Sequence, residues 1–113
     1  MRAIIAGGRT YQFTMDDIKF LDESRELIPI TEVVCGMAKG ADEAGRQWAL
    51  WNHIPVKEFP ADWKKNGRGA GFVRNREMAE YADALIIFPG GRGSMHMAKT
   101  AFEMNLEIYE NIN

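Results

Sequence analysis

Four short strand-forming segments, each followed at once by glycine or proline, are the feature that most limits how this sequence can fold. They cover residues 2–6, 31–35, 55–59 and 84–88. The stretches between them carry helix signals, so strand and helix alternate along the chain. This alternation predicts repeated strand–helix–strand units, which pack as a parallel sheet with helices on both faces.

The first two helices can be placed from capping residues and apolar spacing. Thr14 is a suitable N-cap, with acidic residues in the turn that follows it. A second helix is predicted over residues 41–52, with Ala44, Trp48 and Trp51 on its inward face.

The remaining elements follow from the same signals. A polar, glycine-bearing loop over residues 60–71 is expected to lead into a helix over residues 72–81, and Ser94 is expected to cap a last helix that ends near Met104. Residues 106–110 can add a fifth, edge strand. The predicted fold class is therefore α/β: a Rossmann-like, three-layer domain with a parallel sheet of four to five strands.

Length and composition set further limits. We expect residues 1–113 to form a single domain, because this length is typical of one hydrophobic core. The first apolar run is too short for a signal peptide or a membrane span, so a cytoplasmic location without membrane association is expected. With Cys35 as the only cysteine, we predict no disulfide, no metal site and no required cofactor. A net charge of −2 disfavours a protein that mainly coats nucleic acid.

The glycines are concentrated in the loops that follow the predicted strands. Ten of the eleven lie there: Gly7, Gly8, Gly36, Gly40, Gly67, Gly69, Gly71, Gly90, Gly91 and Gly93. In a parallel sheet these loops share the carboxyl edge, where ligands of such sheets bind and where glycine lets backbone N–H groups approach a phosphate. Glycines that only make tight turns are the alternative explanation.

Charge favours an anionic ligand at the same edge. Residues 7–11, 36–43, 60–76 and 89–94 carry net charges of +1, −1, +4 and +1, although the whole chain is acidic. A solvated basic loop around residues 64–68 would also account for part of this excess.

The strongest local signal is the segment from Pro89 to Ser94, Pro-Gly-Gly-Arg-Gly-Ser, between a strand and a helix. Its amides, the Ser94 hydroxyl and the positive end of the helix are suited to hold a phosphate. The segment matches neither the P-loop nor the dinucleotide-binding glycine pattern, and no acidic residue follows Cys35 to hold a ribose. These differences argue against a hydride-transferring dehydrogenase.

Several side chains near these loops have two interpretations each. Arg74 and Asn75 can contact phosphate and ribose, or form a cap and a surface ion pair. Arg9 can contact the ligand or pair with a nearby carboxylate. Trp63 can stack on a base or fix its loop to the body of the protein.

The motifs in this order resemble those of the SLOG superfamily, and most closely its small YspA/YpsA-related proteins. The resemblance rests on residues 7–9, 36–42, 59–63, 74–78 and 89–94 and spans nearly the whole chain. It implies a nucleotide or a nucleotide derivative, of ADP-ribose, NAD or nucleoside-phosphate type, bound at the glycine loops. The ligand-binding residues expected from the motifs and the resemblance together are Gly7, Gly8, Arg9, Gly36, Met37, Lys39, Gly40, Asp62, Trp63, Arg74, Asn75, Pro89, Gly90, Gly91, Arg92, Gly93 and Ser94.

Three functions remain open. The first is a binding module that acts as a sensor, carrier or sequestering protein for a small nucleotide derivative. The second is an N-glycosidic hydrolase like the LOG phosphoribohydrolases, but Met97 occupies the position of their catalytic glutamate and no catalytic residue can be assigned. The third is single-stranded DNA binding, because residues 72–76 resemble a segment of DprA proteins. We also expect a homodimer or a higher homo-oligomer.

Overall fold

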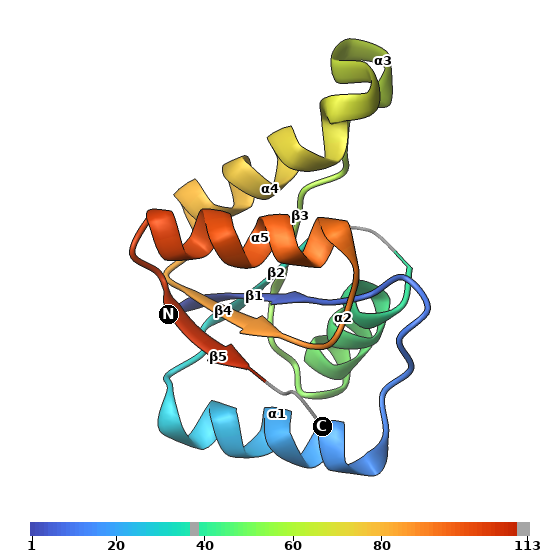
Figure 1. Ribbon diagram of the computed structural model, residues 1–113. Helices are drawn as coiled ribbons and strands as arrows, with labels where there is room; N and C mark the ends of the chain where they lie inside the picture. Colours follow the sequence, from blue (N-terminus) through green and yellow to red (C-terminus); the bar gives the residue numbers. More distant parts are fainter. Residues whose placement is uncertain (37–38, 111–113) are drawn as a thin grey trace.

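The computed structural model describes residues 1–36 and 39–110 and contains one five-stranded parallel sheet (Figure 1). Its strands lie in the order β3-β2-β1-β4-β5. Their bounds are β1 Arg2–Ala6, β2 Glu32–Cys35, β3 Val56–Glu58, β4 Ala84–Ile87 and β5 Glu107–Glu110. Along the chain, β2 and β3 are added on one side of β1, and β4 and β5 are then added on the other side of β1. This reversal lies between β1 and β4, which are paired from Ala3 with Ala84 to Ala6 with Ile87.

Helices cover both faces of the sheet, which confirms the predicted three-layer α/β architecture (Figure 1). One layer contains α1 (Met15–Leu27) and α2 (Ala41–Trp51), and the other contains α4 (Ala70–Tyr81) and α5 (Arg92–Glu103). Successive side chains of a strand point to opposite faces, so β1 serves both cores. Ile5 belongs to the core with Trp48, whereas Ile4 belongs to the core with Met78 and Met97.

The start of α1 is fixed by a capping box. Thr14 Oγ1 accepts a hydrogen bond from the Asp17 amide at 3.2 Å, and Asp17 Oδ2 accepts one from the Thr14 amide at 2.8 Å. The fully buried Asp17 carboxylate also accepts a hydrogen bond from the Tyr11 hydroxyl at 2.8 Å. Desolvation, together with this hydrogen bond and the charge of Asp17, raises the pKa of Tyr11 to about 12. The predicted N-cap is thus correct.

The inward face of α2 differs from the prediction. Trp48 is buried and its Nε1 donates to Asp22 Oδ1 at 2.9 Å, but Trp51 is 71% exposed. The buried stripe of α2 runs through Ala41, Gly45, Trp48 and Ala49. A Cβ on Gly45 would lie 2.4 Å from Ile5 Cγ2, so this glycine lets α2 approach β1 closely. That close approach sets the rotation of the helix and turns Trp51 outward.

Two more boundaries need correction. The segment predicted as an irregular loop contains a short helix, α3 (Trp63–Asn66), and a 3₁₀ turn over residues 67–69 that leads directly into α4. Ser94 is not the N-cap of α5, because the helix already begins at Arg92 with Gly91 as its N-cap. Within the described residues, no helix has the length and apolar character needed to cross a membrane.

Candidate functional site

The loops that follow β1 and β4 meet the start of α2 at the carboxyl edge of the sheet. The Gly8 amide donates to the Pro89 carbonyl at 2.9 Å, and the Gly8 carbonyl accepts from the Ala41 amide at 3.2 Å. Gly40, between β2 and α2, has φ +76°, and a Cβ there would lie 2.2 Å from the Gly8 carbonyl oxygen. Only glycine fits this contact without strain. The loops after β1, β2 and β4 therefore converge, as the glycine distribution predicts.

An open hollow of about 720 Å³ lies at this edge. Ten of the predicted ligand-binding residues line it: Gly7, Gly8, Arg9, Trp63, Arg74, Asn75, Gly91, Arg92, Gly93 and Ser94. The size is within the range of pockets that hold small ligands, from about 300 to 1,000 Å³. The hollow lies beside β1 and β4, where the strand order reverses, and this is the usual ligand position in open parallel sheets.

The other predicted residues lie around the hollow or apart from it. Gly36 is beside Arg74, and Gly40 packs on the loop that follows β1. Pro89 and Gly90 line a second, smaller hollow of about 190 Å³. Met37 lies outside the described residues.

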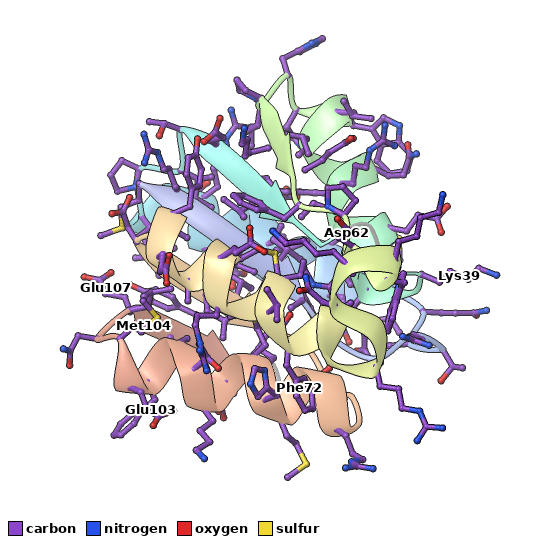
Figure 2. The ribbon with its side chains drawn as sticks, turned by 90° about the horizontal axis from the view of Figure 1, so that it is seen from above. Lys39, Asp62, Phe72, Glu103, Met104 and Glu107 are labelled. Carbon is purple, nitrogen blue, oxygen red and sulfur yellow. The ribbon has the colours of Figure 1, made fainter. Side chains whose placement is uncertain are left out.

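Two charged side chains from the predicted set are not among the lining residues. Asp62 is the N-cap of α3, where its Oδ1 accepts from the Lys65 amide at 3.0 Å. The exposed Lys39 side chain extends away from the body of the protein (Figure 2). Both are therefore less suited to contact a ligand than the residues on the hollow.

The helix that begins at the hollow, α5, starts at a glycine N-cap, Gly91. Within the described chain, no side chain caps it, and its first turn contains no acidic residue. Three other helices differ: Thr14 caps α1, Asp62 caps α3, and α2 has Asp42 in its first turn and the Gly8 carbonyl on its first amide. Among the described residues, the start of α4 also has no capping side chain and no acidic residue, but it continues directly from the 3₁₀ turn over residues 67–69. The positive end of a helix dipole and its free amides attract an anion. Gly91, Arg92, Gly93 and Ser94 bring that end of α5 to the hollow.

Charge in the hollow is mostly positive. Among the described lining residues are Arg9, Arg68, Arg74 and Arg92, with Asp42 as the acidic residue. Burial lowers the pKa of the Arg74 guanidinium, and the charge of Asp42 acts in the opposite direction. The arginines give the hollow an excess of positive charge, which favours an anionic ligand.

Asn75 connects Arg74 to the start of α5. Its Oδ1 accepts from Arg74 Nε at 3.2 Å, and its Nδ2 lies 3.2 Å from the Gly93 carbonyl oxygen and 3.2 Å from His96 Nδ1. Arg74 Nη1 in turn donates to the Gly36 carbonyl. Asn75 is buried, and this network links the loop after β2 with α4 and α5. The arrangement holds the guanidinium in a defined position at the hollow.

His96 is placed to accept a hydrogen bond from Asn75. Burial lowers its pKa, the charges of Arg76 and Lys99 lower it further, and Glu103 opposes them. Since the Asn75 amide nitrogen can only donate, His96 Nδ1 accepts and the ring proton is on Nε2.

The hollow also includes residues outside the predicted ligand-binding set. They are Ala6, Asp42, Arg68, Gly71, Phe72, Met78 and Met97. Arg68 and Phe72 are adjacent to glycines in sequence, and Asp42 is two residues after Gly40. Closeness to a loop glycine could therefore have indicated these three residues as candidates. Met97 is buried, and a thioether cannot take the part of a carboxylate in N-glycosidic cleavage.

Comparison with known proteins identifies related sequences. The model of the YspA, cpYpsA-related SLOG family (YAcAr) matches residues 1–66. The "Gene 61 protein" of Mycobacterium phage D29 is 34% identical over 117 residues, which cover 95% of this chain and 93% of that protein. No solved structure matches. The family match ends within α3, whereas the similarity to the phage protein covers nearly the whole chain.

Proposed function

Because the chain belongs to the YspA- and cpYpsA-related SLOG family, we propose that it binds a nucleotide or a nucleotide derivative in the 720 Å³ hollow. The phosphate group lies at the N-terminus of α5 in this proposal. The protein then acts in the cytoplasm, as a homo-oligomer, to sense, carry or sequester its ligand.

The observation that carries the proposal is the uncapped start of α5 at a hollow with several arginines. Helix N-termini bind phosphate through backbone amides and the helix dipole. Guanidinium groups add charge-assisted hydrogen bonds, which are about twice as strong as neutral ones. Arg74 is well suited to this task, because Asn75 and the Gly36 carbonyl fix its position before the ligand arrives.

Binding without hydrolysis is the form of the proposal that the residues support best. A LOG-type hydrolase needs a carboxylate on α5 at the position that Met97 occupies. Asp42 does line the hollow, but it comes from α2 and lies beside Arg74. We therefore assign Asp42 to balancing the charge of the guanidinium.

Isothermal titration calorimetry with AMP, ADP-ribose and NAD tests the proposal. At least one of the three should bind with a micromolar or tighter dissociation constant, and adenosine, which has no phosphate, should bind at least about tenfold more weakly, a difference of about 1.4 kcal/mol. Native mass spectrometry of freshly purified protein measures the subunit number and reveals any ligand that copurifies. The absence of binding by all three compounds at millimolar concentration would refute the proposal.

The same titrations can reveal the other functions. Release of free adenine during incubation with AMP would indicate a hydrolase. Binding of a labelled oligodeoxynucleotide, with an affinity that falls steeply as salt rises, would indicate a single-stranded DNA-binding protein.

A further inference from the structure

The hollow has two exposed aromatic side chains next to its cationic residues. Trp63 is 54% exposed and Phe72 is 46% exposed, and both line the hollow. We propose that these two rings form the subsite for the base of the ligand, so that the ligand must carry an aromatic base as well as a phosphate. This inference rests on the proposed nucleotide-binding function and adds the part of the ligand that the phosphate site does not recognise.

Phe72 is held as a fixed platform. Its ring stacks on the His96 ring, with centroids 4.0 Å apart and planes 17° apart. Phe72 lies between α4 and α5 (Figure 2), so the stack joins the two helices that flank this side of the hollow. Since His96 covers one face of the Phe72 ring, the other face is the one that a base can stack on.

Trp63 lies beside the phosphate-binding cation. A Cβ on Gly71 would be 4.0 Å from Trp63 Cη2 and 3.7 Å from Arg74 Nη2, so the indole and the guanidinium both lie close to this one small residue. A base and a phosphate separated by a single ribose need subsites that are close neighbours. The placement of Trp63 and Arg74 next to the same residue, Gly71, meets this requirement.

The Phe72 platform and the cation are also joined through shared contacts. Phe72, Arg74 and Asn75 lie within the first turns of α4. Asn75 contacts His96 through Nδ2 and Arg74 through Oδ1, so the ring stack and the guanidinium depend on the same amide. Phe72 and Arg74 therefore belong to one preorganised unit, which reduces the entropy lost when a ligand binds.

Exposed aromatic rings elsewhere on the protein lack this setting. Trp51 is 71% exposed and Phe102 is 75% exposed, but neither lines the hollow. They provide matched controls, because each is an exposed ring of the same type as one of the proposed platforms.

The test compares AMP with ribose 5-phosphate, which has the same phosphate and sugar but no base. Calorimetric titrations are carried out on the wild type, on Trp63→Leu, Phe72→Leu and Phe72→Ala, and on the controls Trp51→Leu and Phe102→Leu. Stacking of one base on an aromatic side chain corresponds to about 5- to 150-fold in affinity. Each platform variant should weaken AMP binding by this factor and change ribose 5-phosphate binding by less than about twofold, and the controls should change neither. Phe72→Leu keeps apolar volume beside His96, so a loss of AMP affinity in this variant reports the missing aromatic face.

The outcomes separate this inference from the function on which it rests. The base subsite is refuted if the wild type binds ribose 5-phosphate as tightly as AMP, or if the platform variants lower the affinity for both ligands equally. Either result leaves the proposed phosphate site unaffected. If the wild type binds neither compound and also fails to bind ADP-ribose and NAD, the nucleotide-binding function itself fails, and the base subsite fails with it.

Discussion

Replacement of Gly91 by aspartate should stabilise the protein and weaken nucleotide binding at the same time. Gly91 is the N-cap of α5, with φ −97° and ψ −143°, and no atom of the described residues, apart from its chain neighbours, lies within 4 Å of a Cβ built there. An aspartate therefore fits without a clash. Its carboxylate can accept hydrogen bonds from the free amides of the first turn, where the phosphate is proposed to bind.

The size of both effects follows from the geometry. Aspartate is better than glycine at an N-cap by a few tenths of a kcal/mol, and a negative charge at the helix dipole adds about 0.3–1 kcal/mol. The free energy of unfolding should rise by about 1 kcal/mol, which corresponds to about 4 °C in Tm for a domain of this size. Two negative charges about 4 Å apart repel by about 1 kcal/mol in water and about 4 kcal/mol at an effective dielectric constant of 20. Binding of AMP should therefore weaken at least about fivefold.

Thermal unfolding followed by circular dichroism measures the first effect, and calorimetric titration with AMP measures the second. Gly91→Asn is the matched control, because asparagine caps the helix equally well but adds no charge. It should give a smaller gain in Tm, because only the cap contributes, and a smaller loss of affinity. A gain in Tm with unchanged AMP affinity in Gly91→Asp would refute the placement of the phosphate, and a fall in Tm would refute the open N-terminus of α5.

Four further predictions concern the framework of the site. Gly40→Ala should lower the free energy of unfolding, measured by urea denaturation, by at least about 2 kcal/mol, because the new side chain combines a positive φ with a Cβ 2.2 Å from a carbonyl oxygen. A variant as stable as the wild type would contradict the packing of the loop after β2. Tyr11→Phe should lower the free energy of unfolding by about 1–3 kcal/mol, because Asp17 loses a hydrogen bond. Since folding raises the pKa of Tyr11 to about 12, the stability of the wild type should fall between pH 10 and 12 more steeply than that of the variant. Folding lowers the pKa of His96, so the contribution of the neutral ring to the free energy of unfolding is complete above the ordinary histidine pKa of about 6.5 and is lost as the pH falls below that value. Unfolding measured as a function of pH, with His96→Gln as the reference, tests this dependence. Asn75→Asp should raise the pKa of His96 in NMR titration, and an unchanged pKa would mean that the contact with His96 does not form in solution.

The layers of the fold could be predicted from the sequence because local signals and burial agree. The strand at residues 84–88 is apolar throughout, as burial on both faces requires, and Thr14 with Asp17 forms the expected cap. The convergence of the loops follows from strand direction, because parallel strands bring their carboxyl ends to one edge. Knowledge of which glycines occur after strands was therefore sufficient to find the edge that contains the hollow.

The details that failed depend on tertiary contacts. The helical spacing of Ala44, Trp48 and Trp51 suits an inward face, but Gly45 against Ile5 rotates α2 so that Trp51 is exposed. Similarly, nothing in local sequence shows that Phe72 stacks on His96, because the two residues are 24 positions apart and meet only when α4 packs on α5. A sequence pattern identifies the edge of a sheet more readily than the partners of a side chain.

The amide of Asn75 has little capacity left for a guest molecule. An asparagine side chain has two N–H donors, and here one points to the Gly93 carbonyl and the other to the His96 ring. Its oxygen already accepts from Arg74, which leaves a single lone pair. A sugar hydroxyl that approaches Asn75 would have to compete with the hydrogen bonds that hold α4 and α5 together. Asn75 therefore acts on the ligand indirectly, by fixing the position of Arg74 beside it.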